Sequence, residues 1–374
     1  MVSNKNNQLA FFELLRAGLW EKEARISQYS ITDYSVIMKL AEEQSVVGLI
    51  TSGLERVQDL KAPQVWLLQF IGSTLQIEQK NKSLNGFVAE LIGLLRKQDI
   101  YTILVKGQGI AQCYERPLWR SSGDIDLLLS KDSYDKAKQL LLPLAEEVES
   151  EDRNFRHLGI SFKGGCVVEL HGTLHGGWSK KVDRIIDSVQ RDVFYGGKVR
   201  SWMNGHTQVF LPGADEDVFF VFTHILQHFF KGGIGLRQIC DWSRLLWTFR
   251  GKLDSGLLEK RLRSAGLMSE WKAFAAMAVE WLGTPVVAIP LYSEASCWKS
   301  KAKRIVDLVM DTGNFGHNRD ESYKQNVFFT KRLVISFGRR FKDAARQFRI
   351  FPLDTMKVWC WVMKTGTKVA VRGK

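Results

Sequence analysis

The spacing of hydrophobic and polar residues divides the chain into a helical beginning, a strand-rich middle and a helical end. Up to about residue 100, apolar residues recur at helical spacing, for example over 65–77 and 84–95. Short apolar runs then predict strands over 101–105, 124–129, 157–162 and 166–171, with a helix over 133–148. Helical periodicity returns over 217–231, 236–249 and most of the remaining chain. The pattern predicts an α+β protein.

This pattern predicts four consecutive parts. They are an N-terminal helical region at 1–100, a sheet-containing core at 101–210, a helical C-terminal domain at 211–323 and a helical tail at 324–374 that is basic and rich in aromatic residues. No internal repeat or low-complexity linker separates them.

Two aspartates occupy alternate positions at the start of the strand predicted over 124–129. Residues two apart on a strand leave the same face, so the carboxylates of Asp124 and Asp126 lie side by side in an apolar run. Asp is depleted in strands, and like charges repel unless a cation neutralises them. Mg²⁺ prefers carboxylate oxygens and shares its other positions with water and phosphates, and Mn²⁺ can take its place. The pair therefore indicates a site for a metal and a nucleotide.

A third carboxylate, Glu169, stands alone in the strand predicted over 166–171, with His171 on the same face. An acid on a neighbouring strand could complete a second metal site or accept the proton of an attacking hydroxyl. We favour this metal triad over a structural role because buried unpaired carboxylates are costly. We interpret His171 as a residue that supports a metal ligand or packs in the core.

A glycine-containing turn follows the first predicted strand and leads into a helix predicted over 108–114. Gly107 and Gly109 would let backbone amides approach a phosphate, and a helix N-terminus favours an anion. Gln112 stands where a dinucleotide fingerprint has its third glycine, and no Gly-Lys-Ser/Thr follows, which disfavours both a Rossmann site and a Walker loop. The candidates for nucleotide binding are Lys106, Gly107, Gln108, Gly109, Arg120 and Gly123. For Arg120, an ordinary surface arginine is the alternative.

Two pairs of polar residues stand at helical i, i+4 spacing farther along the chain. His224 and His228 could hold a metal, but the segment lacks the Glu of a zinc-protease helix, so packing or contact with an acceptor is favoured. Arg237 and Asp241 share a helix face, where an ion pair that braces the helix is slightly favoured over contact with a substrate. All four residues are candidates for the acceptor site or its support.

Composition places few further limits on function. With 374 residues, 45% of them hydrophobic and 25% charged, the chain can form a sizeable core in one or two domains. Its longest apolar runs, at 218–225 and 358–363, are too short to span a bilayer, and the polar start predicts no secretion. Five scattered cysteines without a Cys-x-x-Cys pair fit reduced thiols in the cytoplasm.

The basic charge is concentrated in the tail. Of the net charge of +13, residues 324–374 contribute +11, from 13 Lys/Arg against two Asp. Aromatic residues from Phe328 to Trp361 are interspersed with these cations. Such a tail could contact nucleic acid, an acidic partner or the anionic inner surface of the membrane. The alternative, equally favoured, is amphipathic helices that pack on the protein with a solvated basic face.

The motifs in the middle of the chain resemble those of the nucleotidyltransferase superfamily typified by DNA polymerase beta. They are a glycine turn after a strand, then Asp124-Ile-Asp126, then a separate strand with the acid Glu169. The exact residues of these motifs are more similar to an uncharacterised bacterial nucleotidyltransferase family. That family has a Lys-Gly turn, an Arg before Gly-Asp-Ile-Asp-Leu-Leu and a later Glu-Leu-His. The likeness continues through Asp215-Glu216-Asp217 and the helices that carry the two polar pairs, and covers roughly residues 1–250.

The resemblance implies a small mixed β-sheet core with helical regions on both sides. It also implies Mg²⁺ bound by Asp124, Asp126 and Glu169, and transfer of a nucleoside monophosphate from a nucleoside triphosphate, with release of pyrophosphate. The acceptor is undefined; by analogy with the family, a small molecule such as a sugar phosphate is favoured over RNA. Two alternatives remain, a kinase-like transfer of the γ-phosphate and a non-catalytic protein that binds nucleotides or polyanions.

Overall fold

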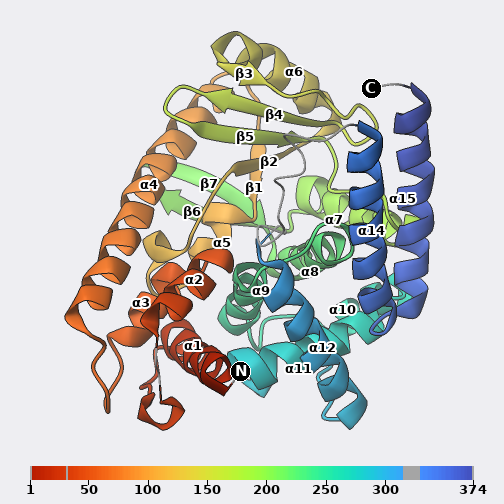
Figure 1. Ribbon diagram of the computed structural model, residues 1–374. Helices are drawn as coiled ribbons and strands as arrows, with labels where there is room; N and C mark the ends of the chain where they lie inside the picture. Colours follow the sequence, from red (N-terminus) through yellow and green to blue (C-terminus); the bar gives the residue numbers. More distant parts are fainter. Residues whose placement is uncertain (1, 31–32, 315–328, 373–374) are drawn as a thin grey trace.

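The computed structural model describes residues 2–30, 33–314 and 329–372 (Figure 1). Its strands form a mixed sheet with the order β3-β4-β5-β2-β1-β7-β6. The strands are β1 (Thr102–Val105), β2 (Ile125–Leu129), β3 (Glu147–Val148), β4 (His157–Phe162), β5 (Cys166–His171), β6 (Val199–Asn204) and β7 (Thr207–Pro212). Strands β2 and β5 are parallel, as are β1 and β7, and the other neighbours are antiparallel. The predicted α+β fold, a mixed sheet with helical regions on both sides, is confirmed.

Helices precede and follow the sheet. Before it lie α1 (Val2–Trp20), α2 (Tyr34–Glu43), α3 (Val47–Leu54) and α4 (Gln64–Arg96). Within it lie α5 (Gly107–Ala111), α6 (Lys131–Leu141) and α7 (Lys180–Tyr195). After it come α8 (Ala214–Lys231), α9 (Leu236–Thr248), α10 (Ser255–Ala265), α11 (Met268–Leu282), α12 (Ser296–Thr312), α14 (Phe329–Phe348) and α15 (Pro352–Arg372).

Three elements differ from the prediction. The helix expected over 133–148 ends at Leu141, because Pro143 falls in the next turn, and residues 147–148 become strand β3. The segments 65–77 and 84–95 belong to one 33-residue helix, α4, since the polar stretch between them contains no helix breaker. The hairpin of β6 and β7 was not predicted.

Alternation along the strands decides which residues face the site. In β2, the side chains of Ile125, Leu127 and Leu129 pack with α4 and α6 on one face of the sheet. The intervening Asp126 and Leu128 therefore point to the other face, where Leu128 packs in the core that contains α8 and α9. The apolar residues of β2 thus hold the strand in a register that presents Asp126 to these two helices.

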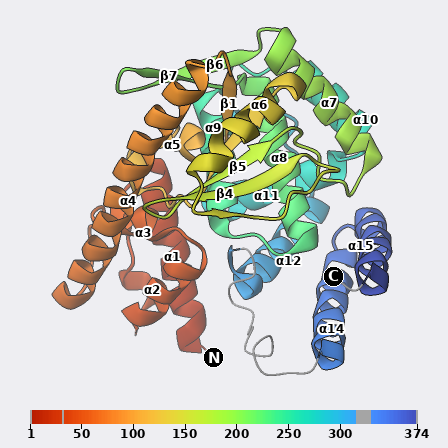
Figure 2. The same ribbon diagram turned by 90° about the horizontal axis from the view of Figure 1, so that it is seen from above.

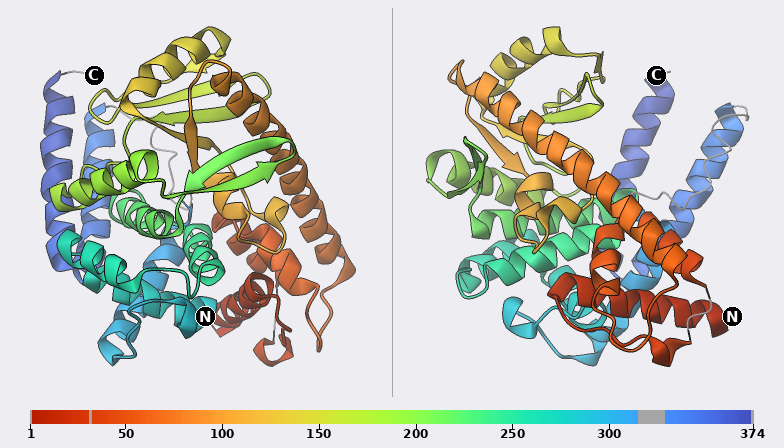
Figure 3. Two further views of the ribbon diagram at one scale, coloured as in Figure 1. Left: turned by 180° about the vertical axis from the view of Figure 1, so that it is seen from behind. Right: turned by 90° about the vertical axis from the view of Figure 1, so that its left-hand side faces the viewer.

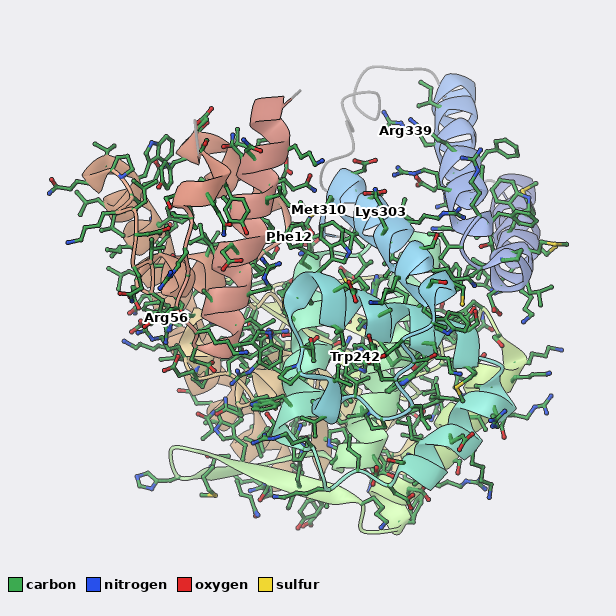
Figure 4. All side chains as sticks on the ribbon, turned by 90° about the horizontal axis from the view of Figure 1, so that it is seen from below. Phe12, Arg56, Trp242, Lys303, Met310 and Arg339 are labelled. Carbon is green, nitrogen blue, oxygen red and sulfur yellow. The ribbon has the colours of Figure 1, made fainter. Side chains whose placement is uncertain are left out.

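The helices before and after the sheet form one packed body (Figure 3). Trp20 of α1 donates a hydrogen bond from Nε1 to the Leu282 carbonyl of α11, at 2.5 Å. The ring of Phe12 contacts Trp281 with centroids 5.1 Å apart. Trp242 of α9, labelled with Phe12 in Figure 4, is fully buried in this body. Residues far apart in sequence therefore share a single core.

The acidic residues at the start of α8 are structural. Asp217 accepts a hydrogen bond from Arg200 of β6 at 2.5 Å, and Glu216 accepts one from Arg261 of α10 at 2.9 Å. All four side chains are largely or fully withdrawn from solvent. Negative side chains in the first turn also favour the helix dipole. These pairs fix the position of α8, which carries the two histidines.

The described part of the tail is attached to the helical body. Helices α14 and α15 lie side by side as a hairpin (Figure 2), and α15 contacts α8. Phe351, between the two helices, contacts the rings of Phe229 and Phe274, and Lys231 lies 4.2 Å from the ring centre of Trp361. Phe328 and the rest of 324–328 lie outside the described residues. Among the described helices, none is both long and apolar enough to cross a membrane.

Glu270 of α11 is buried close enough to Asp354 of α15 to feel its charge, and this predicts how stability depends on pH. Burial, and then the charge of Asp354, raises the pKa of Glu270 from 4.5 to about 8. Between these values the folded protein holds a proton that the unfolded chain releases, so stability falls as pH rises through this window. We expect the Glu270→Gln variant, which lacks this group, to gain stability relative to the parent between about pH 5 and about pH 8.

Thermal unfolding of both proteins at the two pH values measures this difference. Glu259→Gln, at an exposed ion pair with Arg263, is the control and should show the same offset from the parent at both pH values. An offset for Glu270→Gln that does not change with pH would contradict the assignment.

Candidate active site

Strands β2 and β5 bring the three predicted acids together. They pair in parallel with Asp126 opposite Glu169, and Asp124 comes just before β2. One carboxylate oxygen from each of the three residues lies within 4.8 Å of the others. Because all three sit on or next to central strands, their backbone positions are fixed by the sheet. This is a set of oxygen donors of the kind that Mg²⁺ prefers.

The three acids differ in how strongly the protein favours their ionised forms. Burial, and then the nearby charge of Asp126, raises the pKa of Asp124. Burial alone would also raise the pKa of Glu169, but hydrogen bonds with His157 and His171 lower it well below its usual range. Glu169 is therefore held ionised, whereas ionisation of Asp124 is unfavourable in the protein without a bound metal. A bound cation would stabilise the ionised form of Asp124.

Lys106 is the cation nearest to the acids. Its Nζ donates to Oδ1 of Asp126 at 2.6 Å and lies 3.3 Å from Nε2 of His224. Burial would lower the pKa of Lys106, but the charges of Asp126, Glu169 and Asp124 outweigh it and raise the pKa. Lys106 therefore stays charged inside the site. Its backbone has a φ of +59°, which is strained for a residue with a side chain and occurs where the chain turns from β1 into α5.

The rest of the predicted phosphate turn has a more structural character. Helix α5 is shorter than predicted, at five residues. The side chain of Gln108 is buried, where it donates to Asn85 of α4 and accepts from Ser122, each at 2.6 Å. At Gly109, a Cβ atom would lie 2.7 Å from the side chain of Leu211, so glycine lets α5 sit close to β7. These two residues hold the turn in place.

A cavity of about 170 Å³ opens in front of the acids, between the face of the sheet that carries Asp126 and helices α8 and α9. The predicted site residues that line it are Lys106, Gly107, Arg120, Gly123, Asp124, Asp126, Glu169, His224, His228, Arg237 and Asp241. Gln108, Gly109 and His171 are not among its lining residues. His171 instead lies against the acids, with Nε2 2.9 Å from Oδ1 of Asp126. The fold thus gathers most of the candidates around one space.

The two histidines of α8 face this cavity as neutral groups. Their Nε2 atoms lie 3.0 Å apart. Burial, then the charge of Lys106, lowers the pKa of His224 far below its usual value, and the same causes lower that of His228 to about 4. At neutral pH both imidazoles are therefore uncharged and can each donate one hydrogen bond and accept one.

A buried ion pair forms another part of the cavity wall. Asp241 of α9 accepts from Nε and Nη2 of Arg120 at 2.8 and 2.6 Å, and from the hydroxyl of Tyr114 at 2.8 Å. Arg120 and Asp241 are each 5% exposed. The partner that Asp241 binds through both oxygens is thus Arg120 rather than its helical neighbour Arg237, which donates to the carbonyl of Ser121 at 2.8 Å. The Arg120 guanidinium faces the cavity but is held by its partner.

Comparison with known protein families decides the family. The sequence pattern of the family described as uncharacterised nucleotidyltransferase matches residues 31–283, which is most of the chain and includes the whole cavity. The chain belongs to this nucleotidyltransferase family. Among curated proteins, none matches the chain.

Part of this chain is similar to a solved structure. It is an antigenic nucleotidyltransferase-like protein from Paracoccidioides brasiliensis, with 18% sequence identity and a TM-score of 0.30. The match covers 49% of this chain and 91% of the other. A TM-score of this size is too low to compare the two sites.

The structure adds residues that were not predicted. The cavity is also lined by Gln238, Ile110, Val221 and Ile225. Gln238 could have been found from the sequence, because it follows Arg237 on the same helix and lies one turn from Asp241. The other addition, His157, lies 3.2 Å from Glu169 through its Nε2. It opens a correctly predicted strand, but its contact depends on how that strand pairs with β5.

Proposed function

We propose that this protein transfers a nucleoside monophosphate from a nucleoside triphosphate to a hydroxyl or phosphate of a small acceptor, with release of pyrophosphate. The observation that carries the proposal is the convergence of Asp124, Asp126 and Glu169 at a cavity that α8 and α9 enclose. Membership of a nucleotidyltransferase family supports the type of reaction. A protein that only bound polyanions would gain nothing from three carboxylates pointed at its ligand.

The three acids fit a Mg²⁺ ion, and Mn²⁺ would fit the same donors. They offer only oxygen ligands, and burial followed by the charge of Asp126 raises the pKa of Asp124, so its ionised form is disfavoured unless a cation is bound. When bound, such an ion would neutralise the phosphates and polarise the bond that breaks. Without it, the three acids would repel a triphosphate at close range.

The remaining charged groups of the cavity suit the leaving pyrophosphate. Lys106 stays charged beside the acids, and Arg237 and Arg120 place two guanidinium groups in the wall. Arg120 is fixed by Asp241, so it contributes a positioned charge without needing to reorganise. Backbone at Gly107 and Gly123 also lines the cavity and leaves room for a phosphate to approach.

The reaction also needs a group that accepts the proton of an acceptor hydroxyl. The acceptor oxygen forms a bond to the α-phosphorus, the bond from that phosphorus to the β-phosphate oxygen breaks, and pyrophosphate leaves with the electron pair. The lowered pKa of Glu169, held by His157 and His171 against burial, suits a metal ligand better than a base. His224 and His228 also line the cavity as neutral imidazoles that can accept a hydrogen bond from the acceptor hydroxyl, although burial and the charge of Lys106 lower their pKa and make them weak bases.

The walls favour a small acceptor over RNA. The cavity is bounded by the sheet on one side and by α8 and α9 on the other, and its lining mixes charged groups with Ile110, Val221 and Ile225. A sugar phosphate combines apolar ring faces, hydroxyls and a charge, which matches these walls.

We expect the full-length protein to be stabilised against heat by nucleoside triphosphates only when Mg²⁺ or Mn²⁺ is present. With α-labelled nucleotide and a small-molecule fraction of cell extract, the label should pass to an acceptor or appear as nucleoside monophosphate, and pyrophosphate should form. The same assay with γ-labelled nucleotide is the control. Transfer of the γ-label would establish the kinase-like alternative, and a lack of metal-dependent stabilisation by any nucleotide would rule out the metal and nucleotide site.

A further inference from the structure

A second group of possible metal ligands lies directly beside the acids. Nε2 of His157 is 3.2 Å from Oε2 of Glu169, and Nε2 of His171 is 3.3 Å from the same oxygen. The three donor atoms all lie within 4.8 Å of one another. His157 and His171 are opposite each other in the antiparallel pairing of β4 and β5. The sheet therefore fixes all three backbone positions.

The spacing of these atoms matches that of ligands around a small transition ion. Bonds of about 2.0–2.1 Å from a tetrahedral metal to nitrogen or oxygen place the ligand atoms roughly 3.4 Å apart. The two distances to Glu169 differ from this value by no more than a few tenths of an ångström. The third distance, between the two Nε2 atoms, is within 4.8 Å, so rotation of the side chains alone would bring all three donors to one metal, with a water molecule completing its coordination. Both imidazoles would have to bind through unprotonated Nε2 atoms.

The donor set differs in kind from that of the three acids. Imidazole nitrogens favour Zn²⁺ and related transition ions, whereas a set of carboxylates alone favours Mg²⁺ or Mn²⁺. We propose that His157, His171 and Glu169 form a second metal site, selective for a transition ion such as Zn²⁺, which shares the Glu169 carboxylate with the acidic site. The site is reachable from solvent because the side chain of His157 is 33% exposed.

Sharing of Glu169 links the two sites. An ion held by the histidines would draw on the carboxylate that the acidic site also uses, so occupancy of one site changes the donor set of the other. If the proposed nucleotidyl transfer is correct, Zn²⁺ is therefore expected to alter its dependence on Mg²⁺. Zinc binding itself does not require the reaction, so it can be measured without any nucleotide.

The test measures Zn²⁺ binding to metal-free, full-length protein by competition with a fluorescent zinc indicator. We expect one Zn²⁺ per chain, and an affinity at least tenfold weaker in the His157→Gln variant, since loss of a direct ligand should cost no less than the roughly 10–100-fold effect of losing a supporting residue. Co²⁺ in place of Zn²⁺ should give the strong visible absorption of a four-coordinate site, and this absorption should weaken in the same variant. Circular dichroism and thermal unfolding establish that the variant is folded.

Two further variants make the result specific. His175→Gln alters a histidine that pairs with Asp187 on α7 and should leave Zn²⁺ affinity unchanged. His228→Gln tests the other histidine pair of the cavity, whose Nε2 atoms lie 3.0 Å apart, and should also leave it unchanged. Equal affinity in His157→Gln and the parent, loss of binding in His228→Gln alone, or no Zn²⁺ binding by the parent would each overturn the proposal.

Discussion

Asp124→Asn is expected to abolish turnover and at the same time to stabilise the metal-free protein. The carboxylate is one of three that would hold the metal, and loss of about 4 kcal/mol of transition-state stabilisation lowers the rate roughly a thousandfold. Burial and then Asp126 raise the pKa of Asp124, so its charge is unfavourable in the protein without a metal. Removal of that charge should raise the melting temperature by roughly 2 °C.

Release of pyrophosphate from a nucleoside triphosphate and thermal unfolding in a chelator measure the two effects. Asp187→Asn is the matched control, because Asp187 is an exposed aspartate on α7 that pairs with His175. It should change neither quantity appreciably. A variant at Asp124 that retains more than about a tenth of the parent rate would mean that less than about 1.4 kcal/mol depends on this carboxylate, too little for a metal ligand. A fall in melting temperature would contradict the inference that the charge of Asp124 destabilises the metal-free protein.

Asp241→Asn is expected to cause the largest loss of stability, about 3–5 kcal/mol. The carboxylate of Asp241 accepts both hydrogen bonds of the Arg120 fork, and each side chain is 5% exposed. An amide offers one acceptor oxygen and no charge, so the variant leaves a buried guanidinium without a counter-ion. Tyr114, which donates to the same carboxylate, would lose its charged acceptor as well. Urea denaturation measures the change in free energy of unfolding.

A double variant separates the buried charge from other causes. In Arg120→Met/Asp241→Leu both charges are absent, and we expect much of the lost stability to return. Arg263→Ala, which breaks an exposed pair with Glu259, is the control and should cost less than about 1 kcal/mol. If Asp241→Asn is as mild as this control, or if the double variant is no more stable than the single one, the ion pair does not support the fold in this way.

Local pattern was enough to predict the elements that carry the acids. Strands β4 and β5 have the predicted bounds, and alternation along β2 and β5 placed Asp126 and Glu169 on faces that a sheet could bring together. The pairing of β2 with β5 could not be predicted from local pattern, because the choice between parallel and antiparallel neighbours depends on contacts between distant residues. The parallel register that sets Asp126 opposite Glu169 is such a contact.

The missed hairpin had a local signal. Gly205-His206 forms a two-residue loop between two runs of alternating residues, and Gly205 at its first position adopts the positive φ, +59°, that such a turn requires. The pairing of Arg120 with Asp241 had no local signal in the sequence. The two residues are 121 positions apart, and each has other candidate partners nearby in the sequence. The contact of His157 with Glu169 likewise depends on the way β4 folds back on β5.

The contact between α1 and α11 has a consequence for synthesis on the ribosome. The hydrogen bond from Trp20 to Leu282 joins residues 262 positions apart. At about 5–20 residues per second, roughly 13 to 52 seconds pass between the synthesis of the two residues. Throughout this interval Phe12, which contacts Trp281 in the finished fold, has no α11 to cover it. The nascent chain therefore depends on its own early helices, or on a chaperone, to shield an apolar surface that the completed protein buries.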